Sequence, residues 1–348
     1  MSFIEILEEE RVKIEKQIGE FFDRYLQSGM LKSQFVQQFY SDLKNYILNG
    51  GKRLRPISLV MTYKGFGGKK ESIYEPAISV ELLHNASLVH DDIIDHDLIR
   101  RGQPSFHAFY QQWFAKHVKE SSEQSDFGLA MGILGGDLLI DLGQDAILNS
   151  DFDRKLEAVT YYLQSFKELI NGVLFESYLQ SRPLEKVTVN DYLDMITGKT
   201  AALFEKSLLI GQVLADKNER YRKELSDFSI LLGQSFQIRD DILGVFGDAK
   251  KTGKSIEGDI REGKKTLLAI YGSKSSEMKV LYGKKDITSE EVEAVRQLLR
   301  DSGALEKTKG MALKLSERAS EILGSIDLEQ RSFLFFNELV KFVQERFI

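Results

Sequence analysis

Residues 83–95 read LHNASLVHDDIID, an apolar run that ends in a group of carboxylates. The run belongs to a long and mostly apolar pattern over residues 74–97 that is typical of a helix. On such a helix Asp91 and Asp95 are four positions apart and share one face, whereas Asp92 is rotated off that face. A desolvated carboxylate is costly unless a partner neutralises it, so this helix end predicts a bound cation.

A second aspartate pair follows far along the chain, in FQIRDD at residues 236–241. Gln237, Asp240, Asp241 and Gly244 share a helical face at positions i, i+3, i+4 and i+7. Mg²⁺ prefers oxygen ligands and is typically held by one or two carboxylates together with substrate phosphates. Two aspartate clusters that face each other would therefore hold several Mg²⁺ ions around one polyanion. Each cluster alone is also compatible with a solvated acidic helix end.

Basic residues next to glycines give the two clusters a context. GGKRLRP spans residues 50–56, RRG spans 100–102, and lysines follow glycine at 198–200, 253–255 and 263–266. Arginine binds phosphate in a bidentate manner, and lysine acts as a compact point charge. The combination predicts two phosphate-bearing ligands, one of them bound through metal. His84 lies two turns before Asp91 on the same face, where it could bind a ligand or serve as a satisfied core histidine.

The composition favours one large helical domain. The chain has 348 residues, of which 42% are hydrophobic, and contains only 4 prolines and no obvious linker. Apolar residues recur at helical spacing along the chain and predict helices at residues 128–148, 156–179, 189–213, 224–246, 264–271 and 290–300. A capping box formed by Thr288 and Glu291 opens the last of these helices. We expect an all-α domain over residues 1–348, with an exposed polar loop at 119–126.

Charge and cysteine content restrict the partners. The formal net charge of −6 argues against general nucleic-acid binding, which relies on a basic surface. Zero cysteines exclude a disulfide framework and fit a reducing, cytoplasmic compartment. The first residues do not have the pattern of a signal peptide, and the most apolar stretch, residues 128–142, is too short to span a membrane.

Six segments together resemble the trans-isoprenyl diphosphate synthases, the family of farnesyl and geranylgeranyl diphosphate synthases. They are GGKRLRP at 50–56, LHNASLVHDDIID at 83–95, RRGQPS at 100–105, GKTAALF at 198–204, FQIRDD at 236–241 and GDIREGKKT at 258–266. The resemblance implies an isoprenoid synthase-type helical bundle around a deep central cavity, usually in a homodimer. It also implies Mg²⁺-dependent condensation of isopentenyl diphosphate with an allylic diphosphate, and a product that can partition to membranes.

The resemblance assigns roles to matched residues. Isopentenyl diphosphate would be held by Lys52, Arg55, His84 and Arg101. Mg²⁺ would be bound by Asp91 and Asp95, with Asp240 holding a third ion from the opposite wall. The allylic substrate would be contacted by Arg100, Lys199, Thr200, Gln237, Lys254 and Lys264. The catalytic group would comprise Asp91, Asp92, Asp95, Lys199, Asp240, Asp241 and Lys254.

Three departures from the family pattern have consequences. Gly244 replaces the third aspartate of the second motif, which we do not take as loss of activity because water can complete the coordination of Mg²⁺. Residues 172–176 read GVLFE where many relatives carry Gly-Gln-x-x-Asp, which puts one supporting contact in doubt. Residues 111–127 look like a loop insertion that would serve as a lid or a contact loop.

The product length is predicted from the helix that carries the first aspartates. Farnesyl-forming relatives place aromatic residues just before this motif as a floor. Ala86 and Ser87 are small, so we expect geranylgeranyl diphosphate or a longer all-trans product, and Ala86→Phe to shorten it. Two other functions stay open: a terpene cyclase or squalene synthase-like enzyme, and a subunit of a heteromeric prenyl synthase.

Overall fold

The computed structural model describes residues 2–118, 123–215, 219–247 and 257–345. Their contacts divide the chain into two compact units. The first comprises Met1–Tyr162 and Ile210–Lys217, and the second comprises Leu163–Leu209 and Asn218–Ile348. The boundary therefore passes through helices α7 (Lys155–Gln180) and α9 (Ala202–Leu214). The expectation of one domain stays a prediction.

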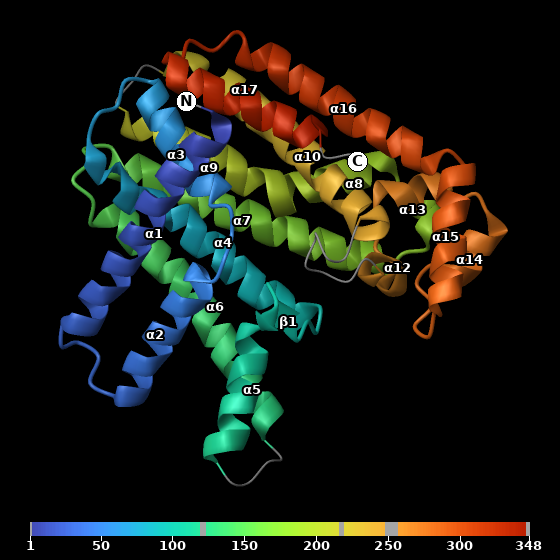
Figure 1. The fold of residues 1–348 in the computed structure, drawn as a ribbon, viewed down its shortest axis with the longest axis horizontal. Coiled ribbons are helices and arrows are strands. Elements are labelled where there is room, and N and C mark those ends of the chain that lie inside the picture. The colour runs from blue at the N-terminus through green and yellow to red at the C-terminus, as the bar shows by residue number, and fades with distance from the viewer. Residues whose placement is uncertain (1, 119–122, 216–218, 248–256, 346–348) are drawn as a thin grey trace. The chain divides into compact units, whose positions relative to one another are not determined.

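The described regular structure of unit 1 is helical apart from one short hairpin (Figure 1). Two strands of two residues each, β1 (Ile99–Arg100) and β2 (Gln103–Pro104), pair antiparallel in that hairpin. The helical elements are α1 (Phe3–Gln27), α2 (Gln34–Leu48), α3 (Leu54–Gly65), the 3₁₀ turn η1 (Glu71–Ile73), α4 (Tyr74–Ile94), α5 (Phe106–His117), α6 (Gln124–Leu148) and the beginning of α7 (Lys155–Gln180).

Helix α4 is the core helix of unit 1. It is apolar on nearly all sides, as expected of a helix surrounded by others, and it contacts α1, α3, α5 and α6. Helices α4 and α6 approach each other closely because α6 has glycines, which lack a side chain, where the two helices meet. A Cβ atom at Gly136 would lie 2.1 Å from Nε2 of His90, and one at Gly132 would lie 2.6 Å from Cδ1 of Ile93. The glycines therefore fix the position of the end of α4 that carries the first aspartates.

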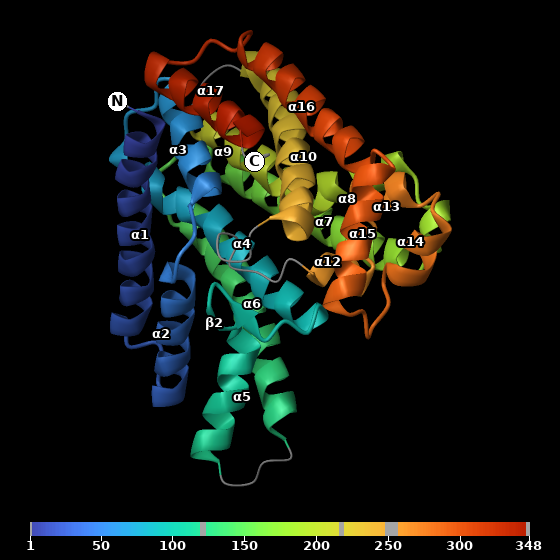
Figure 2. The same ribbon diagram turned by 45° about the vertical axis from the view of Figure 1, so that its right-hand side comes forward.

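Unit 2 contains the remaining helices. Within the described residues they are the rest of α7, η2 (Leu184–Lys186), α8 (Val189–Ile196), the π-helical turn η3 (Thr197–Ala201), α9 (Ala202–Leu214, whose residues from Ile210 on belong to unit 1), η4 (Glu219–Tyr221), α10 (Arg222–Phe246), α12 (Gly258–Glu262), α13 (Leu267–Gly272), α14 (Ser276–Leu281), α15 (Ser289–Asp301), α16 (Ala304–Leu323) and α17 (Gln330–Glu345). Helices α10 and α16 run side by side, and α17 packs on α16 (Figure 2).

A hydrophobic cluster holds the end of α10 that carries the aspartate pair in place. Ile238, Ile242 and Val245 alternate with the aspartate pair along α10 and are buried in a core shared with α8, α12, α13 and α15. Because these apolar positions follow helical spacing, they determine which face of α10 turns away from the core. That face carries Gln237, Asp240 and Gly244.

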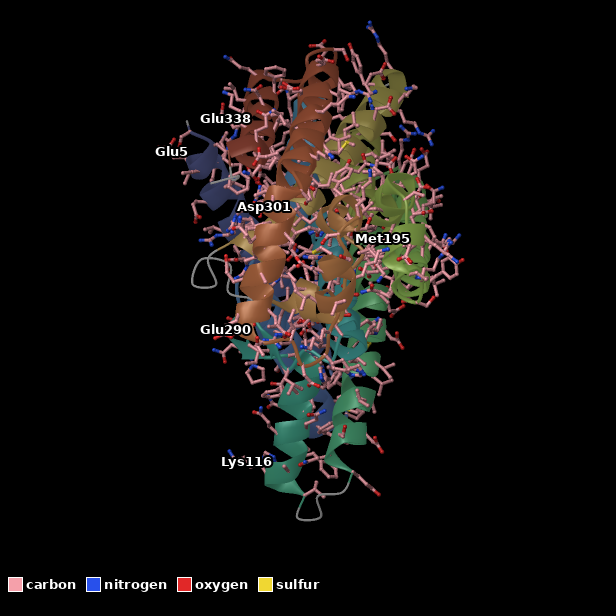
Figure 3. All side chains as sticks on the ribbon, turned by 90° about the vertical axis from the view of Figure 1, so that its right-hand side faces the viewer. Glu5, Lys116, Met195, Glu290, Asp301 and Glu338 are labelled. Atoms are coloured by element: carbon pink, nitrogen blue, oxygen red, sulfur yellow. The ribbon has the colours of Figure 1, made fainter. Side chains whose placement is uncertain are left out.

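Most of the predicted helices are confirmed, including the helix at 290–300. Thr288 and Glu291 form the expected capping box, in which the Thr288 hydroxyl accepts from the Glu291 amide and the Glu291 carboxylate accepts from the Thr288 amide. Glu290 and Asp301 mark the two ends of this helix, α15, in Figure 3. The all-α fold class is confirmed. Among the described helices, none combines the length and hydropathy needed to cross a membrane.

The prediction of a loop at residues 111–127 is wrong for most of its length. Residues 111–117 continue α5, where Lys116 lies near the helix end in Figure 3, and residues 124–127 begin α6. Aromatic contacts stabilise this helical pair: the ring of Trp113 stacks on that of Phe127, and Phe35 of α2 packs edge-on against Trp113. The polar composition of 119–126 concealed the aromatic residues on both sides of it.

Candidate functional site

A group of guanidinium side chains surrounds His84 in unit 1. Burial of the imidazole, together with the positive charges of Arg55, Arg101, Arg53 and Arg100, holds the pKa of His84 well below its usual range. His84 is therefore neutral at neutral pH and can donate or accept a hydrogen bond without adding charge. Four cations near one neutral imidazole form a site suited to a polyanion.

The turn at Gly50 and Gly51 brings this group together. Both glycines have positive φ angles, 82° and 109°, which residues with a side chain rarely adopt. A Cβ atom at Gly51 would lie 2.9 Å from Nη1 of Arg53 and 3.4 Å from Nη2 of Arg101, so no side chain fits there. Arg101 also donates from Nη1 to the Asn49 carbonyl at 3.3 Å. The turn thus holds the exposed Lys52 beside two arginines.

Arg53 is a structural member of this group. Its side chain is fully buried, donates from Nη1 to Glu81 at 2.7 Å, and donates from Nη2 to the Ile47 carbonyl at 2.6 Å. Asn85 donates to the same Glu81 oxygen at 3.1 Å. Arg53 therefore anchors the GGK turn to α2 and α4, while its neighbours Lys52 and Arg55 remain accessible to a ligand.

The first aspartate motif divides into an accessible and a buried part. His84, Ser87, Asp91 and Asp95 lie on one partly accessible face of α4, as their spacing predicts. Asp92 is fully buried and accepts from Nε of Arg100 at 2.8 Å. Arg100 also contacts Asp97. The structure thus pairs Arg100, which the resemblance assigns to the allylic substrate, with Asp92 inside the protein.

The two positions expected to control product length differ in exposure. Ser87 shares the partly accessible face of α4 with Asp91, and its hydroxyl donates to the His84 carbonyl at 2.8 Å. Ala86 is only 1% exposed and is rotated about 100° away from Ser87 around the helix axis. Ser87 is therefore the position from which a larger side chain would extend over the face that carries Asp91.

The second aspartate motif, in unit 2, repeats the same division. The Asp240 side chain is 43% exposed, whereas Asp241 is buried. Tyr192 donates to Asp241 at 2.6 Å, and Gln237 donates to its other oxygen at 2.8 Å. Burial, with a smaller effect of the nearby Asp259 carboxylate, raises the pKa of Asp241 to about 7 despite these hydrogen bonds. Asp241 is thus a buried anchor, and Asp240 is the accessible carboxylate.

Lys199 and Thr200 lie in the π-helical turn η3, a local distortion that is frequent at functional sites. Thr200 donates to Gln237 at 2.8 Å, which links this turn to the Asp241 network. Lys199 pairs with Glu176 at 2.5 Å, so Glu176 provides a carboxylate at the end of GVLFE. The turn lies against Gly172, where a Cβ atom would come within 2.2 Å of the Lys199 amide nitrogen.

Asp259 is a further candidate site residue, one that was not singled out from the sequence. A Cβ atom at Gly244 would lie 2.7 Å from Oδ2 of Asp259, so this carboxylate occupies the space next to the position where the third aspartate is absent. Its charge also contributes to the raised pKa of Asp241. Two features of the sequence could together have indicated it: Gly244 stands where the third aspartate of the second motif is missing, and Asp259 is an aspartate in the later motif GDIREGKKT. The ammonium nitrogen of Lys264 lies nearby, 3.8 Å from Oδ1 of Asp259 and 3.1 Å from Oε2 of Glu262. Lys254 lies outside the described residues.

The donor set fits magnesium bound together with a substrate. Asp91, Asp95 and Asp240 offer hard carboxylate oxygens on accessible helix faces. Within the described ranges, no group of three or more His, Cys, Asp or Glu residues is arranged to hold a metal ion by itself. Mg²⁺ commonly takes one or two carboxylates and completes its shell with phosphate oxygens and water, so the carboxylates present are of the appropriate kind.

Comparisons of the sequence with a family model and with known proteins agree with one another. Residues 37–300 match the family model described as polyprenyl synthetase. A geranylgeranyl diphosphate synthase of Saccharolobus solfataricus is 36% identical over 293 residues, 81% of this chain and 82% of that protein. A geranylfarnesyl diphosphate synthase of Aeropyrum pernix is 34% identical over 310 residues, 85% of this chain and 91% of that protein.

A solved structure shows the same similarity. It is the geranylgeranyl pyrophosphate synthase from Corynebacterium glutamicum complexed with isoprenyl diphosphate and magnesium. The two chains have a TM-score of 0.88 and 27% sequence identity, with 99% of this chain and 100% of that chain covered.

Replacement of Arg53 by methionine should strongly destabilise the protein. Removal of one partner leaves Glu81 as an uncompensated buried charge, which typically costs about 3–5 kcal/mol. Urea unfolding measures this loss. The matched control is Arg11→Met, whose partner Glu8 is exposed, and which should change the free energy of unfolding by less than about 1 kcal/mol. Equal effects of the two substitutions would contradict the assignment of Arg53 as the anchor of the turn.

The neutral state of His84 predicts a pH-dependent stability. Because the folded pKa is depressed below the unfolded value of about 6.5, the unfolded chain binds a proton first as the pH falls. The wild-type protein should therefore lose stability below about pH 6.5, with a contribution from His84 of at most about 1.4 kcal/mol per pH unit. His84→Gln should remove this contribution from the slope measured by urea unfolding between pH 7.5 and 5.5. Parallel slopes would show that His84 is protonated alike in both states.

Proposed function

Because the chain belongs to the polyprenyl synthetase family, we propose that it elongates prenyl chains. It is a trans-prenyltransferase, and the proposed reaction condenses isopentenyl diphosphate with an allylic diphosphate to give geranylgeranyl diphosphate or a longer all-trans product. The main support for the proposal is the set of residues in and around α4. This helix presents His84, Asp91 and Asp95 on one face. The arginines beside His84 come from residues 50–56, which contain the GGK turn, and from the β1–β2 hairpin that contains RRG at 100–102, called the RRG hairpin.

Isopentenyl diphosphate would bind at the GGK turn. Lys52, Arg55 and Arg101 would neutralise its diphosphate. The neutral imidazole of His84 would form a hydrogen bond with it without adding charge. Supporting this assignment, the buried Arg53 already has its carboxylate partner in Glu81, and Arg100 has Asp92. These two arginines would position the loop and the hairpin, and the contact of Arg100 with the allylic substrate stays a prediction.

The allylic diphosphate would be bound with Mg²⁺. Asp91 and Asp95 would hold Mg²⁺ ions, and Asp240 would hold a further ion. The Lys199 and Lys264 ammonium groups and the polar groups of Thr200 and Gln237 would contact the diphosphate, and Lys254 is proposed for the same role from its sequence motif alone. Asp92 and Asp241 would act indirectly, by fixing the rotation of the helices that present Asp91 and Asp240.

Cleavage of the allylic carbon–oxygen bond releases diphosphate and leaves an allylic carbocation. Bound Mg²⁺ would supply Lewis-acid charge to the leaving diphosphate. The Lys199 and Lys264 ammonium groups are held in place by carboxylates before the reaction, so they need little reorganisation as negative charge develops. The double bond of isopentenyl diphosphate then attacks the cation, and loss of a proton restores a double bond. The departing diphosphate can accept that proton, so no protein nucleophile is required.

Assembly and location are proposed from the resemblance and the composition. We propose a homodimer, as is usual in the family, in a cytoplasmic compartment that fits zero cysteines. We also propose that the chain acts as one synthase domain, and that it binds no nucleic acid. Its long-chain product would partition to membranes.

A single assay tests the proposed function. The purified protein is incubated with Mg²⁺, isopentenyl diphosphate and each allylic primer in turn, and the products are identified by mass spectrometry. We expect chains of twenty carbons or more, and no product after chelation of the metal. Turnover of an allylic diphosphate without isopentenyl diphosphate would instead indicate a cyclase. Activity that requires a second, different chain would indicate a heteromeric synthase.

Product length should respond to Ser87 more than to Ala86. Ser87→Phe places a ring on the α4 face that carries Asp91, one turn toward the helix start, and should shift the main product to a shorter chain. Ala86→Phe, which was expected from the sequence to shorten the product, enlarges a side chain that is only 1% exposed, so its expected effect changes to a loss of about 1–3 kcal/mol of stability through overpacking. Mass spectrometry of the products and thermal unfolding measure the two effects. Unchanged product length in Ser87→Phe would exclude this position as the floor.

A further inference from the structure

The connection between α14 and α15 is bound to the segment that carries Asp259 and Lys264 (Figure 1). Tyr282 donates its hydroxyl hydrogen to the Lys264 carbonyl at 2.7 Å. The Gly283 amide donates to the Ile260 carbonyl at 2.9 Å, and Arg261 donates from Nη1 to the Ile287 carbonyl at 2.7 Å. We call these three hydrogen bonds of residues 282–287 the clasp.

Two glycines allow the clasp to close. Gly263 ends α12 with φ of 66°, and Gly283 has φ of 83°. A Cβ atom at Gly263 would lie 2.9 Å from Cα of Gly283, and one at Gly283 would lie 3.3 Å from Cα of Gly263. The two backbones therefore touch where each of them turns, and a side chain at either position would push them apart.

Helix α12 needs this external support. It has five residues, far fewer than the roughly 12–15 at which an isolated helix becomes even marginally stable. Its C-terminal end is closed by hydrogen bonds from the Gly263 and Lys264 amides to the Ile260 and Asp259 carbonyls. Ile260 and Ile287 are both buried, at 0% and 2% exposure, and belong to one hydrophobic cluster. The clasp and this cluster thus determine where the side chains of Asp259 and Lys264 lie.

We propose that Tyr282 and Gly283 are positioning residues for the allylic diphosphate site. They lie outside all six sequence motifs, and they act through the backbone on Lys264 and on α12, which carries Asp259. The inference rests on the proposed function, in which Lys264 contacts the allylic diphosphate. The clasp sets the direction of the Lys264 peptide group, and with it the path along which the ammonium group reaches its ligand. Loss of one clasp hydrogen bond then weakens binding of the allylic substrate without removing any charge from the site.

Tyr282→Phe tests the proposal with the loss of a single hydroxyl group. The net value of one hydrogen bond corresponds to a change of roughly threefold to tenfold in a binding constant. We expect KM for the allylic diphosphate to rise by that factor, whereas KM for isopentenyl diphosphate stays within about twofold. The matched control is Tyr271→Phe, because the Tyr271 hydroxyl forms no hydrogen bond with the described residues. The control should leave both KM values unchanged.

Two further variants separate the clasp from the proposed function. Lys264→Met removes the proposed ligand itself and should raise KM for the allylic diphosphate more than Tyr282→Phe does. Gly283→Ala disturbs the contact with Gly263 and should also raise that KM selectively. If Lys264→Met changes nothing, the assignment of Lys264 is wrong and the clasp has no function in this reaction. If Lys264→Met has its effect but Tyr282→Phe behaves like Tyr271→Phe, the clasp is refuted and the proposed function stands. A lower melting temperature with equal changes in both KM values would show a purely structural role and would also refute it.

Discussion

The cost of burying a carboxylate determines how both aspartate motifs are built. In each motif the second aspartate of the pair is buried and bound by the protein: Asp92 by Arg100, and Asp241 by Tyr192 and Gln237. Neighbouring side chains on a helix point about 100° apart. Fixing one aspartate inside the protein therefore fixes the rotation at which Asp91 or Asp240 is presented on an accessible face. The buried member of each pair positions its neighbour.

The positive charges follow a similar division. Several guanidinium groups close to His84 repel one another, and the protein reduces this repulsion by giving buried carboxylates to two of them, Glu81 to Arg53 and Asp92 to Arg100. The same ion pairs anchor the GGK turn and the RRG hairpin to α4. A substrate diphosphate would bring further negative charge to this cationic group, which favours an anion before one binds.

Features that depend on local spacing could be predicted from the sequence. The capping box of α15 involves residues three apart, and the common face of Asp91 and Asp95 follows from helical periodicity. Features that depend on distant segments could not. Spacing does not show that Arg100 is bound by Asp92, that Gly172 permits the π-helical turn at Lys199, or that Asp259 lies against Gly244. The helical ends of the 111–127 segment were missed because its polar centre outweighed its flanking aromatic residues.

The most direct test of the central claim compares the two aspartates of the first pair. Turnover is measured as a function of Mg²⁺ concentration for Asp91→Asn and Asp92→Asn, together with the melting temperature of each variant. Asp91→Asn should raise the Mg²⁺ concentration for half-maximal turnover by about tenfold or more and leave the melting temperature nearly unchanged. Asp92→Asn should chiefly lower the melting temperature, because Arg100 loses its buried partner. A weakened Mg²⁺ response in Asp92→Asn alone, with full stability, would contradict the division into anchor and ligand.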